Sequence, residues 1–285
     1  MIESRGEVDY AMGFFELYQE EAKRIEGVTM SSPLKGRRMW TIQQPIGPAA
    51  LITPWNFPLA MVARKVAPAL AAGCSAVLKP SEETPLTALA MCRIFQDAGL
   101  PPGVVNCITA DRSNASVVGA TIAQSPVVRK LSFTGSTIVG KLLMEQSSST
   151  VKKLSLELGG NAPFIVFEDA DIQVAVKALM TSKFRNAGQA CIAPNRVLVQ
   201  EAVLPAFLQE LTEKMKLLQV GDGLDPNVTI GPLINKKGIY NFDIYSKIAI
   251  IVYVLRYAES GRPYSRCIGF GSYLRTRGFA DRRVE

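Results

Sequence analysis

The sequence predicts an α/β fold in which a parallel sheet carries helices on both faces. Short apolar runs rich in β-branched residues alternate with helix-like segments between residues 49 and 157. The chain of 285 residues is 48% hydrophobic, which is enough for one large core or two smaller ones. Its five cysteines contain no CxxC pair, so neither a disulfide framework nor a thiolate metal site is expected. Strands spaced by helices imply right-handed crossovers, which wrap both sides of the sheet.

The elements follow in regular order along the chain. We expect strands at residues 49–52, 75–79, 104–109, 130–134 and 153–157, separated by helices near 58–72, 84–98, 113–124 and 136–146. Thr84-Pro85 supports the second of these helices, because a cap residue there precedes a proline at the first helical position. A polar, hairpin-like insert is expected at 27–45, ahead of the sheet.

A second α/β domain is expected to begin after the sheet. Its predicted elements are a helix over 169–184, a strand over 196–200 and a helix over 201–218. The sequence therefore predicts a Rossmann-type first domain over 1–158, a partial second domain over 159–238 and a tail over 239–285.

The chain contains no histidine, and this excludes several classes of enzyme. Ser-His-Asp and Cys-His hydrolases need an imidazole as base, and most catalytic zinc sites need it as a ligand. No metal site is therefore predicted. Proton transfer near neutral pH falls instead to a carboxylate, a lysine or a cysteine whose pKa has been shifted by its surroundings.

Charge and hydropathy argue against nucleic-acid and membrane partners. The net charge is +7, but residues 239–285 carry eight basic and four acidic side chains, which is more than half of that excess. The apolar run Ile248–Leu255 is much shorter than the about 20 residues that span a bilayer. The N-terminal MIESRGEVDY lacks the apolar core of a secretory signal, so the cytoplasm or the mitochondrial matrix is the expected compartment.

In parallel sheets ligands bind beyond the carboxyl ends of the strands, and two candidate cofactor motifs fall there. The FTGSTIVG turn over 133–140 offers glycine backbone and the free N–H groups of a helix start to a phosphate, although a plain strand-to-helix turn has the same form. Lys79 and Glu82 are suited to the hydroxyls of a ribose, or else form a solvated turn. Glu82 would repel a 2′-phosphate, which favours NAD over NADP.

A second group of residues is suited to catalysis. Asn56, in the stiff apolar TPWNFP loop, is suited to donating a hydrogen bond to an oxyanion, or else closes a turn. Glu157 ends an apolar strand, where burial among leucines would raise its pKa toward that of a general base; the alternative is a glutamate that reaches solvent. Cys191 is a candidate nucleophile. Arg64 and Arg185 could bind a substrate carboxylate through paired hydrogen bonds.

Five motifs in this order, TPWNFP, KPSE, FTGST, LELGGNAP and FRNAGQAC, resemble those of the aldehyde dehydrogenase superfamily. The resemblance covers approximately Val8 to Gly238 and is strongest to the branch that oxidises succinate semialdehyde. It implies NAD(P)-dependent oxidation of a small semialdehyde to a carboxylic acid, a step of 4-aminobutyrate degradation. It also implies a homo-oligomeric family, and it leaves the assembly of this chain open.

The resemblance implies roles for particular residues. Cys191 would form a thiohemiacetal and then a thioester, Asn56 and the Cys191 backbone N–H would hold the oxyanion, and Glu157 would activate the hydrolytic water. Arg64 and Arg185 match positions that bind the substrate carboxylate. The first domain would be the NAD-binding domain and the second a partial catalytic domain. The residues expected to contact NAD are Thr53, Pro54, Trp55, Arg64, Lys79, Pro80, Ser81, Glu82, Gly135, Ser136, Thr137 and Gly140.

Two departures from the family pattern stand out. Ala193 occupies the position at which many members of the branch carry a second cysteine, so a redox-switching disulfide is not expected. The resemblance ends after GPLINKKG, and the region that supplies the EIFGP glutamate for the nicotinamide ribose is missing. We therefore expect a shortened or misjoined gene product whose segment Tyr240–Glu285 is poorly ordered or loosely packed. The alternatives are another aldehyde specificity, or an incomplete fragment that at most binds nucleotide.

Overall fold

A computed structural model describes residues 1–236, 238, 251–257 and 263–269 of the chain. Its contacts divide these residues into two units, Ile2–Gly159 and the residues from Gly160 onward, with Met1 grouped with the second. The boundary between the units falls at the glycine pair that follows the last strand of the first sheet.

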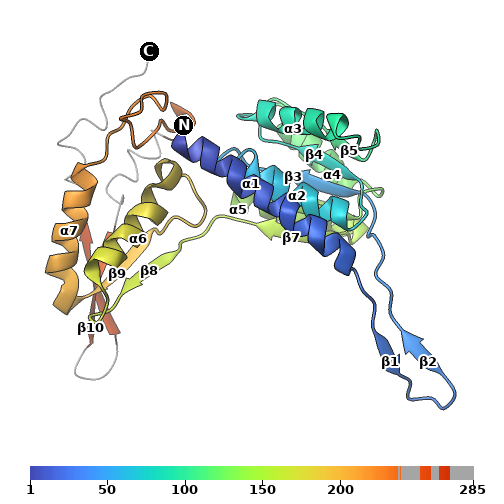
Figure 1. The fold of residues 1–285 in the computed structure, drawn as a ribbon, viewed down its shortest axis with the longest axis horizontal. Coiled ribbons are helices and arrows are strands. Elements are labelled where there is room, and N and C mark those ends of the chain that lie inside the picture. The colour runs from blue at the N-terminus through green and yellow to red at the C-terminus, as the bar shows by residue number, and fades with distance from the viewer. Residues whose placement is uncertain (237, 239–250, 258–262, 270–285) are drawn as a thin grey trace. The chain divides into compact units, whose positions relative to one another are not determined.

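The first unit is built on a parallel sheet (Figure 1). Its strands are β3 (Ala49–Ile52), β4 (Ala76–Lys79), β5 (Val105–Cys107), β6 (Lys130–Thr134) and β7 (Lys153–Glu157), in the spatial order β5-β4-β3-β6-β7. The central strand β3 is buried along its whole length, as its apolar AALI sequence requires. Ile52 at the end of β3 is in register with Lys79 on one side and Phe133 on the other, so these strands end together.

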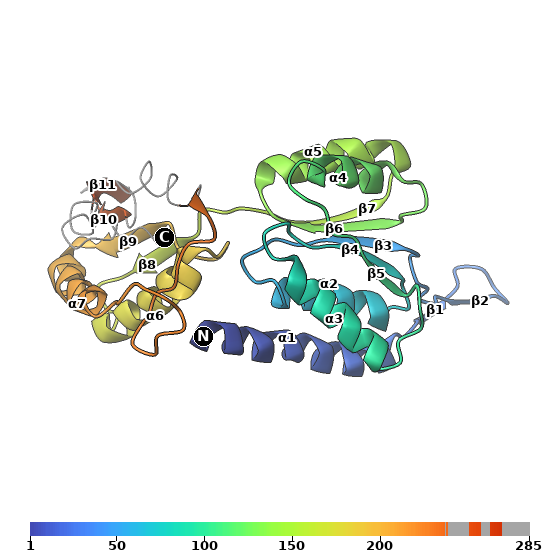
Figure 2. The same cartoon turned by 90° about the horizontal axis from the view of Figure 1, so that it is seen from above.

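Helices cover both faces of this sheet, which confirms the predicted fold class (Figure 2). One face carries α1 (Ile2–Glu21), α2 (Ala60–Ala71) and α3 (Pro85–Asp97), and the other carries α4 (Ala115–Gln124) and α5 (Thr137–Ser147). Alternate residues of the strands feed the two cores: Leu51 and Leu78 pack against α2 and α3, whereas Ile52 and Leu131 pack in the cluster that contains Leu143 of α5.

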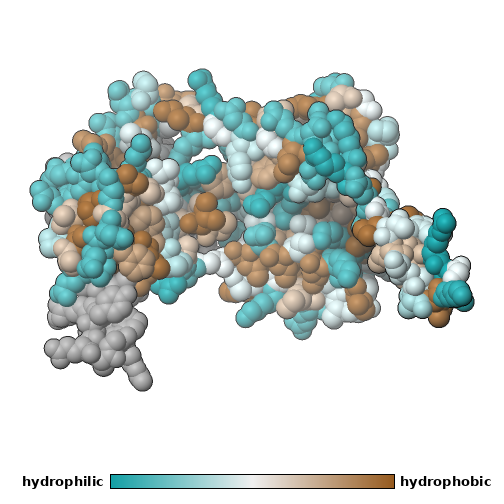
Figure 3. All heavy atoms as spheres, turned by 60° about the horizontal axis from the view of Figure 1, so that its bottom comes forward, coloured by the Kyte–Doolittle hydropathy of each residue, from teal (hydrophilic) through white to brown (hydrophobic). Residues whose placement is uncertain are grey.

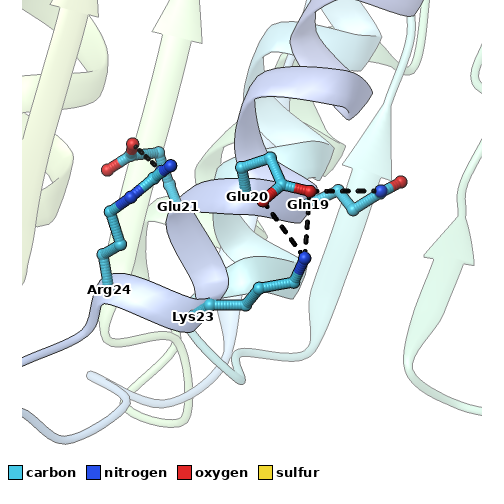
Figure 4. Close-up of polar contacts among 5 residues, drawn as sticks. All are labelled: Gln19, Glu20, Glu21, Lys23 and Arg24. Carbon is cyan, nitrogen blue, oxygen red and sulfur yellow. Dashed lines mark hydrogen bonds and ion pairs between the residues drawn. The ribbon is translucent and has the colours of Figure 1, made fainter.

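Helix α1 was not among the elements that the sequence pattern predicted. Only Ala11 of this helix is buried, and its partly buried Phe14 and Phe15 join the core on the α2 side. At its end, ion pairs between residues three apart continue into a 3₁₀ turn (Figure 4): Lys23 Nζ lies 2.9 Å from Glu20 Oε1, and Arg24 Nη1 lies 2.7 Å from Glu21 Oε1. These pairs are exposed, so they stabilise the helix end only slightly.

The segment expected to form a hairpin, residues 27–45, contains strands β1 (Thr29–Ser31) and β2 (Arg38–Trp40), which pair antiparallel. Thr41 closes its base, because its N–H donates to Val28 O at 2.8 Å. A side chain at Gly27 would collide with the carbonyl oxygen of Thr41, so only glycine allows this close approach. The hairpin forms the arm at the right edge of Figure 3, where hydrophobic and hydrophilic residues both reach the surface.

The second unit is a smaller α/β layer. Its elements are β8 (Pro163–Val166), α6 (Ile172–Phe184), β9 (Arg196–Gln200), α7 (Leu204–Lys216), β10 (Ile251–Tyr257) and β11 (Pro263–Gly269), with strand order β11-β10-β9-β8. Strands β8 and β10 both run parallel to β9, and β11 is antiparallel to β10. Val197 and Val199 of β9 are buried against Val176 of α6 and Phe207 of α7. Short 3₁₀ turns in the chain occupy Ala22–Arg24, Ser148–Thr150, Arg185–Gly188 and Glu201–Val203.

The segment expected to be poorly packed, Tyr240–Glu285, is described only in part. Strands β10 and β11 lie within it, whereas residues 239–250, 258–262 and 270–285 lie outside the described residues. In the portions of the chain that the structure describes, every helix is too short or too polar to cross a membrane.

Candidate active-site residues

The carboxyl ends of four neighbouring strands bring most of the predicted cofactor residues to one edge of the first sheet. Strands β4, β3, β6 and β7 are adjacent and parallel, and the loop that follows each of them starts at the same edge. Two backbone hydrogen bonds connect these loops: Thr53 N donates to Lys79 O at 3.1 Å, and Gly135 N donates to Glu157 O at 3.0 Å. The sequence motifs therefore form a single edge within the first unit.

Lys79 and Glu82 lie at the end of β4, and the structure excludes a simple solvated turn. The Lys79 side chain is 6% exposed, whereas that of Glu82 is 31% exposed. Lys79 Nζ donates to Pro80 O at 3.0 Å and lies 3.7 Å from Glu82 Oε2. Ser81 is buried beside them. A buried ammonium next to a reachable carboxylate leaves Glu82 as the acceptor that a sugar hydroxyl could meet.

The start of α5 is formed by the FTGST turn. Ser136 is the N-cap residue, and its Oγ accepts a hydrogen bond from Val139 N at 3.4 Å. A Cβ at Gly135 would lie 2.5 Å from Cζ of Phe133, so glycine allows the turn to lie on that ring. A Cβ at Gly140 would collide with the Leu158 side chain, so glycine there lets α5 approach the loop after β7. Packing thus accounts for Gly140, which was expected to contact cofactor.

Asn56 lies in the loop between β3 and α2, and its side-chain oxygen is buried. The helix that follows is held at its start by α1: Glu7 Oε1 accepts hydrogen bonds from Leu59 N at 2.7 Å and Ala60 N at 2.9 Å. Arg64, one turn further on, lies with its guanidinium carbon 5.7 Å from the centre of the Phe14 ring. In this unit the environment of Arg64 therefore includes an aromatic ring of α1.

Glu157 is the last residue of β7 and is exposed. The expectation that it would be buried among leucines is wrong, because β7 is the edge strand of the sheet and its odd-numbered residues face solvent. The alternative that the sequence left open, a strand-end glutamate that reaches solvent, describes the structure.

Three buried polar side chains of the first unit, Lys65, Ser132 and Thr134, were not identified from the sequence, whereas Thr53 was among the residues expected to contact cofactor. The hydroxyls of Thr53 and Thr134, at the ends of β3 and β6, are buried and have no hydrogen-bond partner within the described part of the chain. Lys65 of α2 is 6% exposed, and its Nζ donates to Ser132 Oγ of β6 at 2.7 Å. Burial, and then the charge of Arg64, lowers the pKa of Lys65 to about 8. The sequence feature that could have identified them is a polar residue within an otherwise apolar strand or helix.

Cys191 lies in the second unit, whereas Asn56 and Glu157 lie in the first. It occupies a turn just beyond the 3₁₀ segment Arg185–Gly188, and its thiol is exposed. Among the other cysteines that the structure describes, Cys74 is buried, and burial raises the pKa of Cys92 and raises that of Cys107 to about 12. Cys191 is therefore the most accessible thiol of these four.

The turn around Cys191 has an unusual backbone. Asn186 and Ala187 adopt left-handed conformations with φ of 51° and 53°, ahead of Gly188 at 76°. The side chain of Gln189 connects this turn to a distant segment, because its Nε2 donates to Asn186 O at 3.1 Å and its Oε1 accepts from Ile234 N at 3.0 Å. The predicted substrate residue Arg185 is exposed at the start of the turn.

Among the described residues, neither a cluster of metal-binding side chains nor the groove between α6 and α7 coincides with the predicted site. No three side chains of the metal-binding types His, Cys, Asp and Glu gather within that part of the chain. A shallow groove of about 400 Å³ lies in the second unit between α6 and α7, lined by Gln173, Lys177, Met180, Thr181, Glu210 and Lys214. None of the predicted site residues lines it.

A parallel sheet with polar loops at its carboxyl edge, followed by an α/β unit with an exposed cysteine, places the chain in the class of α/β proteins whose parallel strands end at a ligand-binding edge. The profile of the aldehyde dehydrogenase family matches residues 1–251. The chain therefore belongs to the aldehyde dehydrogenase family, which confirms the resemblance found in the motifs.

Named relatives and solved structures agree with this assignment. The chain is 52% identical over 248 residues to a probable succinate-semialdehyde dehydrogenase [NADP(+)] of Sinorhizobium fredii, covering 87% of this chain and 50% of the relative. It is 50% identical to the mitochondrial succinate-semialdehyde dehydrogenase of Homo sapiens, covering 83% and 44%. The crystal structure of the Burkholderia pseudomallei succinate-semialdehyde dehydrogenase superposes with a TM-score of 0.84 at 50% identity, covering 86% and 50%. The chain thus spans about half the length of these relatives.

Proposed function

We propose that this chain provides the dinucleotide-binding part and the nucleophile of an NAD(P)-dependent aldehyde dehydrogenase that converts succinate semialdehyde to succinate. The observation that carries the proposal is the carboxyl edge of the first sheet, where the loops after β3, β4, β6 and β7 start together. The identity of about half the residues to succinate-semialdehyde dehydrogenases supports the choice of substrate.

The edge residues fit a nicotinamide dinucleotide. The buried hydroxyls of Thr53 and Thr134, which have no partner among the described residues, offer hydrogen bonds at the strand ends, which is where such ligands bind. The first N–H groups of α2 are already engaged by Glu7, so the start of α5 at Ser136 is the helix terminus suited to phosphate oxygens. Glu82 would accept from the adenosine ribose. When bound, the nicotinamide ring would accept a hydride from the substrate carbon.

The remaining steps of the reaction are assigned to side chains and backbone groups of this chain. The Cys191 thiolate would attack the aldehyde carbon, and the Asn56 amide and the Cys191 backbone N–H would hold the oxyanion that forms. After oxidation the substrate would be a thioester on Cys191. Glu157, exposed at the end of β7, would take a proton from the water that releases the acid and regenerates the thiol. Arg64 and Arg185 would bind the carboxylate of the semialdehyde.

The choice between the two dinucleotides is the finer part of the proposal. Glu82 would oppose a 2′-phosphate, but several relatives carry NADP(+) in their names, and the sequence-based preference for NAD gains no support from them. Lys79, 3.7 Å from Glu82, is a cation that could offset that repulsion. Glu82→Gln should therefore strengthen NADP⁺ binding by about tenfold relative to NAD⁺, a change of roughly 1.4 kcal/mol. Isothermal titration with both dinucleotides measures this ratio, and an unchanged ratio would remove Glu82 from the choice.

The substrate assignment is tested with the purified 285-residue chain. Formation of reduced dinucleotide is followed with succinate semialdehyde and with an uncharged aldehyde of the same length. Preference for the acid supports the proposal, and turnover without preference supports another aldehyde specificity. Dinucleotide binding without turnover of either aldehyde supports the incomplete fragment, which is the second candidate because the chain spans half of its relatives. Cys191→Ser is the matched control and should abolish turnover.

The role of Glu157 is tested by Glu157→Gln. The substitution keeps the size of the side chain and removes its proton acceptor, so the thioester should form and then hydrolyse slowly. After mixing with succinate semialdehyde and oxidised dinucleotide, mass spectrometry of the intact protein should show an acyl adduct, and a digest should place it on the Cys191 peptide. Hydrolysis at the parent rate would exclude Glu157 as the base.

A further inference from the structure

Helix α2 begins without a capping residue of its own. Its N-cap position is Leu59, an apolar side chain that cannot accept a hydrogen bond from the first turn. The acceptor comes instead from α1, where one oxygen of Glu7 receives the N–H groups of Leu59 at 2.7 Å and Ala60 at 2.9 Å. Hydrogen bonds of this length to a carboxylate are charge-assisted, and the negative charge also favours the positive end of the helix.

A second contact joins the same two helices further along. The Phe14 ring of α1 lies beneath the guanidinium of Arg64, 5.7 Å from its central carbon. Between the two contacts, Ala11 of α1 is 2% exposed and packs in the same core cluster as Val62 of α2. Figures 1 and 2 both show α1 running alongside α2. The segment of α1 from Glu7 to Phe14 is therefore fixed to the first turns of α2.

We propose that Glu7 is a positioning residue that holds the TPWNFP loop, and with it Asn56 and Arg64, in the geometry of the site. The chain from Asn56 to Leu59 is only a few residues long, so the place at which α2 begins sets where the Asn56 amide can lie. The chemical purpose of this contact rests on the proposed function, which gives Asn56 and Arg64 their roles.

The test uses a property of the chain that needs no turnover. Trp55 is the neighbour of Asn56, and the only other tryptophan is Trp40 in the hairpin. In the Trp40→Phe background, acrylamide quenching of fluorescence reports how tightly the TPWNFP loop is held. We compare four further variants: Glu7→Ala, Glu7→Asp, Glu7→Gln and Glu16→Ala. Glu16 is an exposed glutamate of the same helix and is the matched control.

The four variants separate hydrogen bonding from charge. Glu7→Ala removes the acceptor, and Glu7→Asp keeps the charge but shortens the side chain by one methylene, so both should raise the quenching constant of Trp55 by about twofold. Glu7→Gln keeps an acceptor oxygen at full length and should stay near the parent value, as should Glu16→Ala. Equal quenching in the parent and Glu7→Asp, or a rise in Glu7→Gln equal to that in Glu7→Asp, would overturn the inference. Because three different substitutions are compared, failure of one to fold leaves the others to decide.

A second measurement connects the contact to the site. NADP⁺ affinity should fall by about tenfold in Glu7→Asp and be restored in Glu7→Gln, since a positioning role depends on the acceptor. If the parent binds NADP⁺ and Glu7→Asp binds it with the same affinity, the inference is overturned and the proposed function stands. No binding by the parent would count against the proposed function, and the quenching result would still decide the role of Glu7.

Discussion

Lys65 should make the stability of the first unit depend on pH in a direction opposite to that of most lysines. Its ammonium is buried against the sheet with Ser132 Oγ as hydrogen-bond acceptor, and burial lowers its pKa from 10.5 to about 8. Between these two pH values the folded state binds fewer protons than the unfolded state, so the free energy of unfolding rises with pH. Below about pH 8 the cost of the buried charge is present in full.

The size of this effect follows from the shift in pKa. A fall from 10.5 to about 8 corresponds to roughly 3 kcal/mol, at about 1.4 kcal/mol for each pH unit. Lys65→Met keeps a long side chain and removes the titrating group. The variant also loses the bond to Ser132, at a cost of about 1–3 kcal/mol that does not depend on pH. The pH dependence of the difference between the two proteins therefore isolates the buried charge.

The assay is urea unfolding from about pH 7 to pH 10.5, followed by tryptophan fluorescence. Both tryptophans, Trp40 and Trp55, belong to the first unit, so the signal reports its unfolding. Relative to that of Lys65→Met, the free energy of unfolding of the parent should rise by roughly 3 kcal/mol across this range. Lys141→Met, at an exposed position of α5, should give a curve parallel to that of the parent. A constant difference between the parent and Lys65→Met would refute the reasoning.

Three further predictions concern stability. Ala187 has a left-handed φ of 53°, so Ala187→Gly should raise the free energy of unfolding of the second unit by about 1 kcal/mol. The control Ala178→Gly, within α6, should lower it by a similar amount. Equal effects of the two substitutions in chemical denaturation would argue against strain at Ala187. Gly27→Ala should open the base of the hairpin, because its methyl group would collide with Thr41 O, and faster proteolysis within residues 27–45 would detect this; an unchanged cleavage pattern would mean that the hairpin can shift to accept it. Lys152→Met should lower the free energy of unfolding by about 1–2 kcal/mol, since Lys152 Nζ donates to Ser125 O at 2.8 Å and Ile122 O at 3.2 Å beside the end of α4. Lys153→Met, at an exposed neighbouring position, is the control, and equal thermal unfolding of the two variants would contradict the prediction.

The strands were predicted well because their signal is local. The runs at 49–52, 130–134, 153–157 and 196–200 match β3, β6, β7 and β9 residue for residue, since each is apolar or alternating and bounded by turn residues. The edge strand β8 was not among the predicted elements: its first residue, Pro163, ends the LGGNAP motif, and proline and glycine there hide a short strand.

Helix starts and buried side chains were predicted less well, and some of them depend on partners far away in the sequence. The helix expected from 169 begins at Ile172, because Asp171 caps it by accepting from Val174 N. The start of α2 is fixed by Glu7, which no local pattern identifies. Glu157 was expected to be buried from its apolar neighbours, but the order of strands decides burial, and β7 lies at the edge. Lys65 and Thr134 were missed because each interrupts an apolar pattern without itself forming a motif.

The contact between Glu7 and α2 has a consequence for how the chain can be trimmed. A deletion variant that starts at Met12, within α1, would still have Phe14 beneath Arg64 but neither Glu7 nor Ala11. Such a variant would keep every motif of the dinucleotide edge and yet begin α2 with two backbone donors left to water.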